Sequence, residues 1–87
     1  MNDFTQLRVY NDSVRLTASV YEFTHTLPRA ERWDLSRQLR RAAVSVPANI
    51  AEGAGRGDAK DFARFIRIAI GSLCELQSHL DVCTACD

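Results

Sequence analysis

The sequence lacks three features that would each have pointed to a particular class of protein. It has no apolar run near the ~18 residues that a membrane-spanning helix needs. The segment Met1 to Gln6 lacks the basic and then apolar layout of a secretory signal. Cysteine is scarce, and two of its three residues lie at the extreme end, which argues against a disulfide scaffold. We therefore expect a cytoplasmic protein without a membrane partner.

Net charge is also absent, because eleven basic residues balance eleven acidic ones. The charges are unevenly placed: residues 1–28 carry a net −1, residues 29–67 a net +4 and residues 68–87 a net −3. A neutral chain is not expected to bind nucleic acid avidly and without specificity. The basic middle third still leaves room for a local anionic partner.

The spacing of apolar residues is helical along the whole chain. With 87 residues the chain forms one domain, 1–87, and it shows neither β-hairpin dipeptides nor sustained period-two alternation. The pattern predicts an all-α up-down bundle with helices over about 7–26, 34–52 and 58–85. A chain this short buries only about 60–65% of its unfolded surface, so it needs a very regular core or a partner chain.

Capping residues and glycine predict where the helices begin and end. Pro28 ends the first helix, because the residue before a proline is pushed out of the helical region. Asp34 or Ser36 suits the N-cap of the second helix, and Asp58 suits that of the third. Gly53 is the expected left-handed residue after the second helix.

A proline lies inside the second predicted helix. Pro47 lacks a backbone N–H, so it removes one helical hydrogen bond and predicts a kink. Asn49 and Glu52 follow it in an otherwise apolar helix end. They are candidates to cap the backbone groups that Pro47 leaves free, or to pair across a subunit interface.

Two of the predicted helices carry more apolar surface than a lone three-helix hairpin buries. The first has stripes on nearly opposite sides, and the third has a heptad seam that neighbouring apolar residues widen. We expect oligomerisation, the alternative being a monomeric bundle with a few surface apolar residues. The stripes are Leu7, Tyr10, Val14, Ala18, Tyr21, His25 and Leu16, Val20, Phe23, Leu27; the seam is Phe62, Ile66, Ala69, Leu73, Leu76, Leu80, Cys83.

Seven basic residues on the second helix and around the start of the third are candidates to bind nucleic-acid phosphates. Helical spacing brings several of them together, and Trp33 is nearby as a possible stacking residue. The alternative is a solvated face that Asp34, Glu52, Asp58 and Asp61 partly neutralise. The candidate residues are Arg37, Arg40, Arg41, Arg56, Lys60, Arg64 and Arg67.

No other pattern assembles a site for catalysis, a cofactor or a metal. The glycine-rich stretch 53–57 follows no strand and precedes no Lys-Ser/Thr pair, so it is not a phosphate-binding loop. Cys83 and Cys86 form a CxxC without the two further ligands of a zinc site. His25 and His79 fit no triad order. We expect no enzyme, no cofactor, no metal and no small-molecule substrate.

Two ordered strings of residues resemble one known family. Residues 40–53 read Arg-Arg-Ala-Ala-Val-Ser-Val-Pro-Ala-Asn-Ile-Ala-Glu-Gly, and residues 68–76 read Ile-Ala-Ile-Gly-Ser-Leu-Cys-Glu-Leu. Together with the segment from Tyr21 to Pro28, they resemble the four-helix bundle proteins of 23S rRNA intervening sequences. The accessory variability protein of diversity-generating retroelements is similar. The resemblance covers roughly residues 4–82.

The resemblance implies an up-down four-helix bundle that assembles into a homopentamer and has no established catalysis. Its retroelement members are thought to bind nucleic acid and a reverse transcriptase through a basic surface, and the seven basic residues occupy the corresponding region. The fourth helix has no counterpart in these residues, which end near the end of the third helix. We therefore expect a self-assembling scaffold, with RNA or DNA as a possible second partner. The alternative is a module that docks a partner helix on the third-helix stripe.

Overall fold

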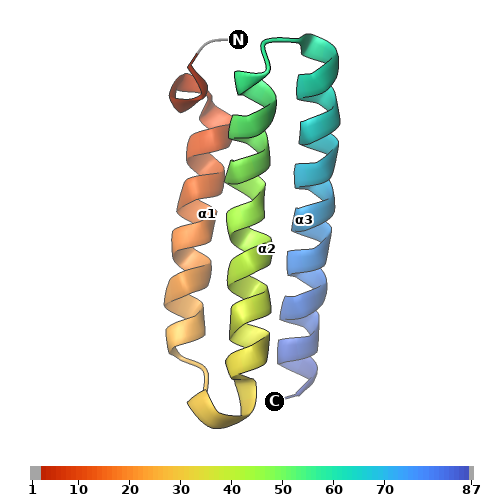
Figure 1. Cartoon of the computed structure of the whole chain (residues 1–87). Helices are drawn as coiled ribbons and strands as arrows, with labels where there is room; N and C mark the ends of the chain where they lie inside the picture. Colours follow the sequence, from red (N-terminus) through yellow and green to blue (C-terminus); the bar gives the residue numbers. More distant parts are fainter. Residues whose placement is uncertain (1–2, 87) are drawn as a thin grey trace.

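The structure, a computed structural model, describes residues 3–86 except the side chains of residues 29–33, so that of Trp33 lies outside the described part. Over these residues it is all-α, with three α-helices and no strand. A short 3-10 helix, η1 (Phe4–Gln6), precedes α1 (Arg8–His25), α2 (Arg29–Gly55) and α3 (Ala59–Ala85). The helices run alternately down and up in a body of 44 × 19 × 16 Å (Figure 1). The all-α prediction is confirmed, and the four-helix type of the bundle stays a prediction.

The chain enters α1 through η1. The Asp3 carboxylate accepts hydrogen bonds from the hydroxyl and the backbone N–H of Thr5, and these bonds lower the pKa of Asp3. The Asn11 side-chain amide donates to the carbonyl oxygens of Thr5 and Leu7, at 3.0 and 3.1 Å. These bonds tie η1 to the first turn of α1.

The second helix begins earlier than predicted. Pro28, in an extended conformation (φ −59°, ψ 135°), precedes the first helical residue, Arg29. This is consistent with proline's fixed φ, which suits the start of a helix. The predicted N-caps Asp34 and Ser36 instead lie inside α2. Asp34 accepts a hydrogen bond there from the Gln38 amide at 3.0 Å.

The turn between α2 and α3 uses a different glycine from the one predicted. Gly53 lies within α2, which ends at Gly55, and Gly57 adopts the left-handed conformation with φ 72°. Gly53 is buried against α3, and a Cβ at this position would lie only 2.7 Å from Cβ of Phe65. The predicted N-cap of the third helix is confirmed, since the Asp58 carboxylate accepts a hydrogen bond from the backbone N–H of Lys60 at 3.1 Å.

Pro47 lies inside α2, and a residue of α1 contacts the carbonyl that it leaves without a helical donor. That carbonyl belongs to Ala43, four residues earlier. The Thr17 hydroxyl lies 3.1 Å from the Ala43 carbonyl oxygen and 2.9 Å from that of Ser13 in its own helix. Asn49 donates instead to the Ser45 carbonyl oxygen at 2.8 Å and Glu52 accepts from Arg56, so neither caps the Ala43 carbonyl; the alternative, that they pair across a subunit interface, stays a prediction. The kink at Pro47 stays a prediction.

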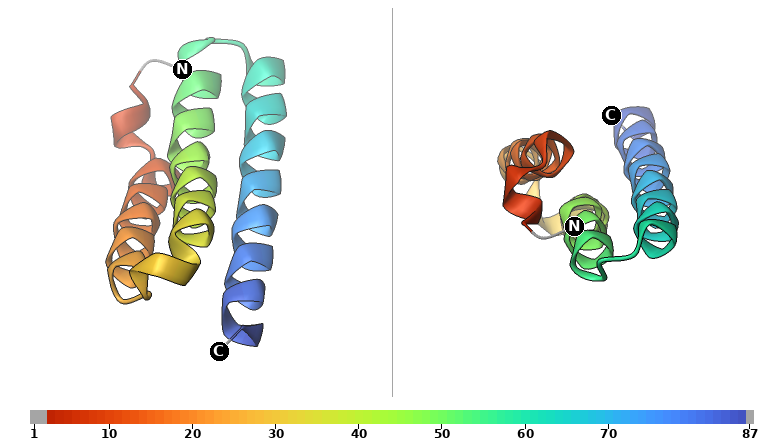
Figure 2. Two further views of the ribbon diagram at one scale, coloured as in Figure 1. Left: turned by 60° about the horizontal axis from the view of Figure 1, so that its bottom comes forward. Right: turned by 90° about the horizontal axis from the view of Figure 1, so that it is seen from above.

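The second helix lies between the other two. It packs against α1 on one side and α3 on the other, whereas no Cα atom of α1 lies within 8 Å of a Cα atom of α3. Seen from above in Figure 2, the helices occupy three corners of a square with α2 at the middle corner. One side of α2 is thus flanked by α1 and α3 without a helix bridging them.

The core is built on this flanked side of α2. One cluster joins Val20 of α1, Leu39 of α2 and Leu76 of α3, and a second joins Val46 and Ile50 of α2 to Ala69 of α3. Small and polar residues let α2 and α3 approach closely at two places. The Ser45 and Ser72 hydroxyl oxygens are 2.5 Å apart, and Gly53 meets Phe65 nearer the turn. The helices are therefore held in a defined register.

The buried face of α1 lies between the two apolar stripes predicted for it. Its buried or half-buried residues include Ser13, Thr17 and Thr24 together with Val20. Leu16 and Phe23 on one flank, and Val14 and Tyr21 on the other, remain between 37% and 41% exposed. Neither stripe is fully buried within this chain, although we expected one of them to face the core.

Candidate functional site

The seven candidate basic residues fall into two groups at different levels along the bundle. Arg37, Arg40 and Arg41 lie in the first half of α2 and are called the α2 arginines below. Arg56, Lys60, Arg64 and Arg67 lie at the turn after α2 and in the first third of α3, and are called the turn cations. The contact of Ser45 with Ser72 sets the register of α2 and α3, and with a rise of 1.5 Å per residue it places the nearest members of the two groups, Arg41 and Arg67, about 13 Å apart along the bundle. The structure therefore gives two basic patches.

Among the α2 arginines, Arg40 is fixed against α1. Its Nε donates a hydrogen bond of 2.8 Å to the Thr24 hydroxyl, whose own hydrogen is donated to the Tyr21 carbonyl oxygen at 2.7 Å. The Arg40 guanidinium also lies over the Tyr21 ring, 4.5 Å from its centroid. Thr24 is only 5% exposed. This contact fixes the position of a half-buried cation on the outer side of the α1–α2 interface.

The other two α2 arginines border hollows on the outside of the bundle. Arg37 pairs with Asp34 at 3.7 Å. The exposed side chain of Arg41 lines a hollow of about 410 Å³ between α2 and α3, together with Glu75. The α2 arginines also line a hollow of about 420 Å³ beside Tyr21.

Two of the four turn cations lie over one aromatic ring. Arg56 pairs with Glu52 at 3.2 Å and its guanidinium lies 5.1 Å from the Phe65 ring centroid. Arg64 lies 4.5 Å from the same centroid. Lys60 and Arg67 are exposed on the same side of α3 as Arg64, by their helical spacing. Within residues 3–86 neither forms an ion pair.

A third surface is apolar and lies on the flanked side of α2. Leu16 and Phe23 are within one helical turn of Val20, which belongs to the core, and Leu73 is one turn from the core residue Leu76. These residues extend the two edges of the core beyond what α2 covers. The surface, called the open face below, comprises Val9, Leu16 and Phe23 of α1 with Ile70 and Leu73 of α3, all between 37% and 53% exposed.

The remaining candidate groups are dispersed. Cys83 is buried, whereas Cys74 and Cys86 are exposed. The His79 ring lies 3.2 Å from the Glu75 carboxylate. No cluster of three His, Cys, Asp or Glu suited to a metal ion occurs among the described residues. Across residues 3–86, no helix has the length and apolarity required to span a membrane.

Sequence reasoning missed the residues that position the arginines. Tyr21 and Thr24 contact Arg40 across two helices, and Phe65 lies beneath Arg56 and Arg64. The sequence pattern places Tyr21 in an apolar stripe of the first helix. Thr17 and Thr24 are seven residues apart and so share one side of that helix, which is the sequence signal for a polar line on it.

Comparison with known families agrees with the helical arrangement and the residue strings. The sequence model described as 23S rRNA-intervening sequence protein matches residues 5–87. The chain belongs to the 23S rRNA-intervening sequence protein family. A search of curated proteins found no match. The family match spans all three helices of this intervening-sequence protein, so the resemblance is confirmed.

Proposed function

We propose that this intervening-sequence protein is a non-enzymatic cytoplasmic scaffold that assembles with copies of itself through its open face. The supporting observation is that apolar residues border the core on α1 and α3 while the backbones of these two helices stay more than 8 Å apart, measured between Cα atoms. The number of copies that we propose is five, as the resemblance to the family implies.

The exposed area supports an uncovered face. A compact monomer of 9.8 kDa exposes roughly 5,200 Å² by the usual scaling with mass. This chain exposes 5817 Å². Exposed single apolar residues are common, but apolar residues that continue a core edge are typical of an interaction surface.

The open corner suggests how the copies pack. In an up-down four-helix bundle the fourth helix lies between the first and third and opposite the second. We propose that the bundle is of this type and that a helix from another copy lies against Phe23 and Leu73. Such packing would bury both edges of the core at once.

The solution mass tests this proposal. Sedimentation equilibrium is expected to give a multiple of 9.8 kDa at micromolar concentration, with five copies as the proposed number. A folded species of 9.8 kDa throughout that range would contradict self-assembly. A monomer that binds an unrelated amphipathic helix on α3 would instead support the partner-helix alternative.

Nucleic-acid binding is a second candidate function, and the turn cations favour it. Lys60, Arg64 and Arg67 share one exposed side of α3, and none of the three forms an ion pair with a described residue. Exposed cations at helical spacing suit contacts with successive phosphates. Glu52, Asp58 and Asp61 lie close in sequence and offset part of this charge.

Filter binding of structured RNA over a salt series tests this second function. The affinity is expected to fall with salt, and the double variant Lys60→Gln/Arg67→Gln is expected to reduce the salt slope by about 1–2. The matched control is Arg8→Gln, which removes an exposed cation of α1 that lies 4.0 Å from Asp12. Equal binding by the double variant and the control would contradict a role for the turn cations.

A further inference from the structure

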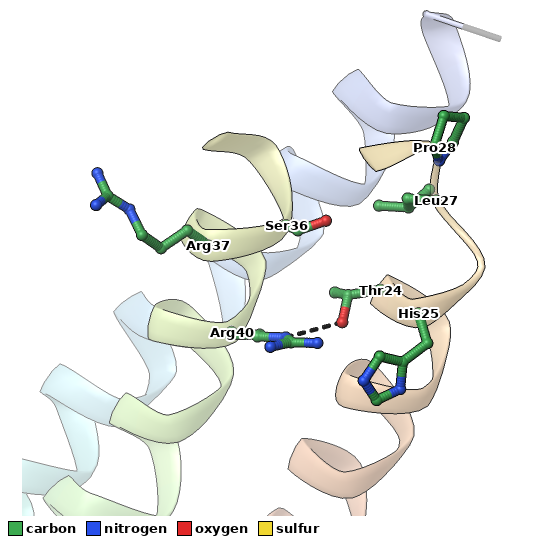
Figure 3. A pocket seen from close by; sticks show the side chains of 7 residues that line it. All are labelled: Thr24, His25, Leu27, Pro28, Ser36, Arg37 and Arg40. Carbon is green, nitrogen blue, oxygen red and sulfur yellow. Dashed lines mark hydrogen bonds between the residues drawn. The ribbon is translucent and has the colours of Figure 1, made fainter. Parts of the chain in front are cut away.

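A hollow on the outer side of the α1–α2 interface is lined by polar groups that take no part in the proposed self-assembly. It has a volume of about 520 Å³ and lies between the end of α1 and the start of α2. Figure 3 shows Arg40, His25 and Ser36 projecting into this space, whereas Arg37 points away from it. The hollow is lined by Thr24, His25, Leu27, Pro28, Ser36, Arg37 and Arg40.

The arrangement around Arg40 is suited to an anion. The Arg40 Nε is occupied by Thr24 and one face of its guanidinium by Tyr21. The two terminal nitrogens of the guanidinium make no ion pair with any described residue. A half-buried, immobilised guanidinium loses little entropy on binding an oxyanion, and its fork matches two of the oxygens.

The other residues that line the hollow also suit an anion. Within the described part of the chain, no acidic residue lines this hollow. The hydroxyl of Ser36 and the ring of His25 offer further hydrogen-bond donors. Pro28, the N-cap residue of α2, also lines the hollow and makes no side-chain hydrogen bond to that helix.

A second hollow, with a more apolar lining, adjoins the first at two shared arginines. Arg37 and Arg40 line both, and the second, of about 420 Å³, is completed by Tyr21, Arg41, Val44 and Ser45. No acid lines it among the described residues. An anion bound at Arg40 could therefore carry an apolar or aromatic group that lies along Tyr21 and Val44.

We propose that these two neighbouring hollows together bind a phosphate monoester, with the phosphate at Arg40, Ser36 and His25 and the organic group along Tyr21 and Val44. A phosphate suits the site better than a carboxylate because its additional oxygens can accept from the hydroxyl and the ring as well as the guanidinium. The ester is bound as a ligand and undergoes no reaction. The proposal does not depend on self-assembly, because the open face lies on the other side of the α1–α2 interface.

Titration with phenyl phosphate tests the proposal. Binding is measured by calorimetry and by the NMR signals of the Arg40 Nε–H and the His25 ring. Saturable binding with a Kd of about 1 mM or tighter is expected, and binding of inorganic phosphate is expected to be weaker. Both NMR signals should shift along the same binding curve. Equal affinity for inorganic phosphate, or tighter binding of benzoate, would overturn the monoester assignment.

Variants separate the site from general charge. Arg40→Gln is expected to weaken binding of phenyl phosphate at least about tenfold, and Ser36→Ala about threefold. The charge-matched control Arg67→Gln, on a helix that lines neither hollow, is expected to change it by less than about twofold. Ser36→Ala decides the outcome if Arg40→Gln does not fold. Unchanged affinity in the folded variants would overturn the site.

Discussion

Replacing Phe23 with glutamate is expected to convert the assembled protein into a folded monomer of 9.8 kDa. Phe23 is 39% exposed in the single chain, so part of its surface is available to another copy while the rest packs within its own chain. At a subunit interface the same change removes about 1.5–3 kcal/mol of apolar burial per copy. It also places an unpaired carboxylate in an apolar contact, which costs several kcal/mol more unless the contact opens.

The matched control is Ala18→Glu, which adds the same charge to an exposed position of α1 about 140° around the helix from Phe23. The control is expected to keep the mass of the unmodified protein, while circular dichroism shows that both variants remain helical. Retention of the full assembly by Phe23→Glu would contradict the assignment of the open face as the interface. Unfolding of Phe23→Glu alone would shift the test to Leu73→Glu on α3.

Thr17→Val is expected to lower the free energy of unfolding by about 1–3 kcal/mol, because the Ala43 carbonyl then loses its contact with the Thr17 hydroxyl. In a Pro47→Ala background the cost is expected to fall below about 0.5 kcal/mol. The backbone N–H restored at position 47 then satisfies that carbonyl within α2. Urea unfolding at one fixed protein concentration measures both values.

Thr84→Val is the control for this pair. The Thr84 hydroxyl donates only within its own helix, to the Leu80 carbonyl oxygen at 3.1 Å, and Thr84 is exposed. Its cost is expected to be within about 0.5 kcal/mol in either background. Equal costs of Thr17→Val with and without Pro47 would show that the contact with Ala43 contributes nothing.

The sequence was sufficient for features that depend on local periodicity and capping. Helical spacing predicted the three helices, and Asp58 was correctly predicted as the N-cap of α3 because its effect is confined to the next helical turn. The residue strings in α2 and α3 were specific enough to predict the family.

Features that depend on contacts between helices were not predictable. Gly53 is a residue type that often ends a helix, but it lies inside α2. It has no Cβ at the point where Phe65 approaches across the α2–α3 interface. The line of Ser13, Thr17 and Thr24 on α1 belongs to neither of the predicted apolar stripes, yet hydrogen bonds to the backbone allow it to be buried. The seven basic residues share helical spacing, but their levels along two antiparallel helices divide them into two patches.

The polar buried face of α1 bears directly on the proposed scaffold. Because Ser13, Thr17 and Thr24 occupy the contact with α2, the apolar residues of α1 lie on its flanks. A helix that needed only to cover α2 would place Leu16 or Phe23 in that contact. The distribution is explained if α1 packs against α2 through its polar line and against another copy through its apolar flank.

The most direct test is an isotope-filtered NOE measurement on a mixture of two differently labelled samples of the protein. It detects proton pairs within about 5 Å only when they belong to different copies, which is the range of packed side chains. The account predicts intermolecular NOEs from the Phe23 ring to methyl groups of another copy, and likewise from the Leu73 methyl groups. If neither residue shows an intermolecular NOE, the result would contradict the open face as the site of assembly.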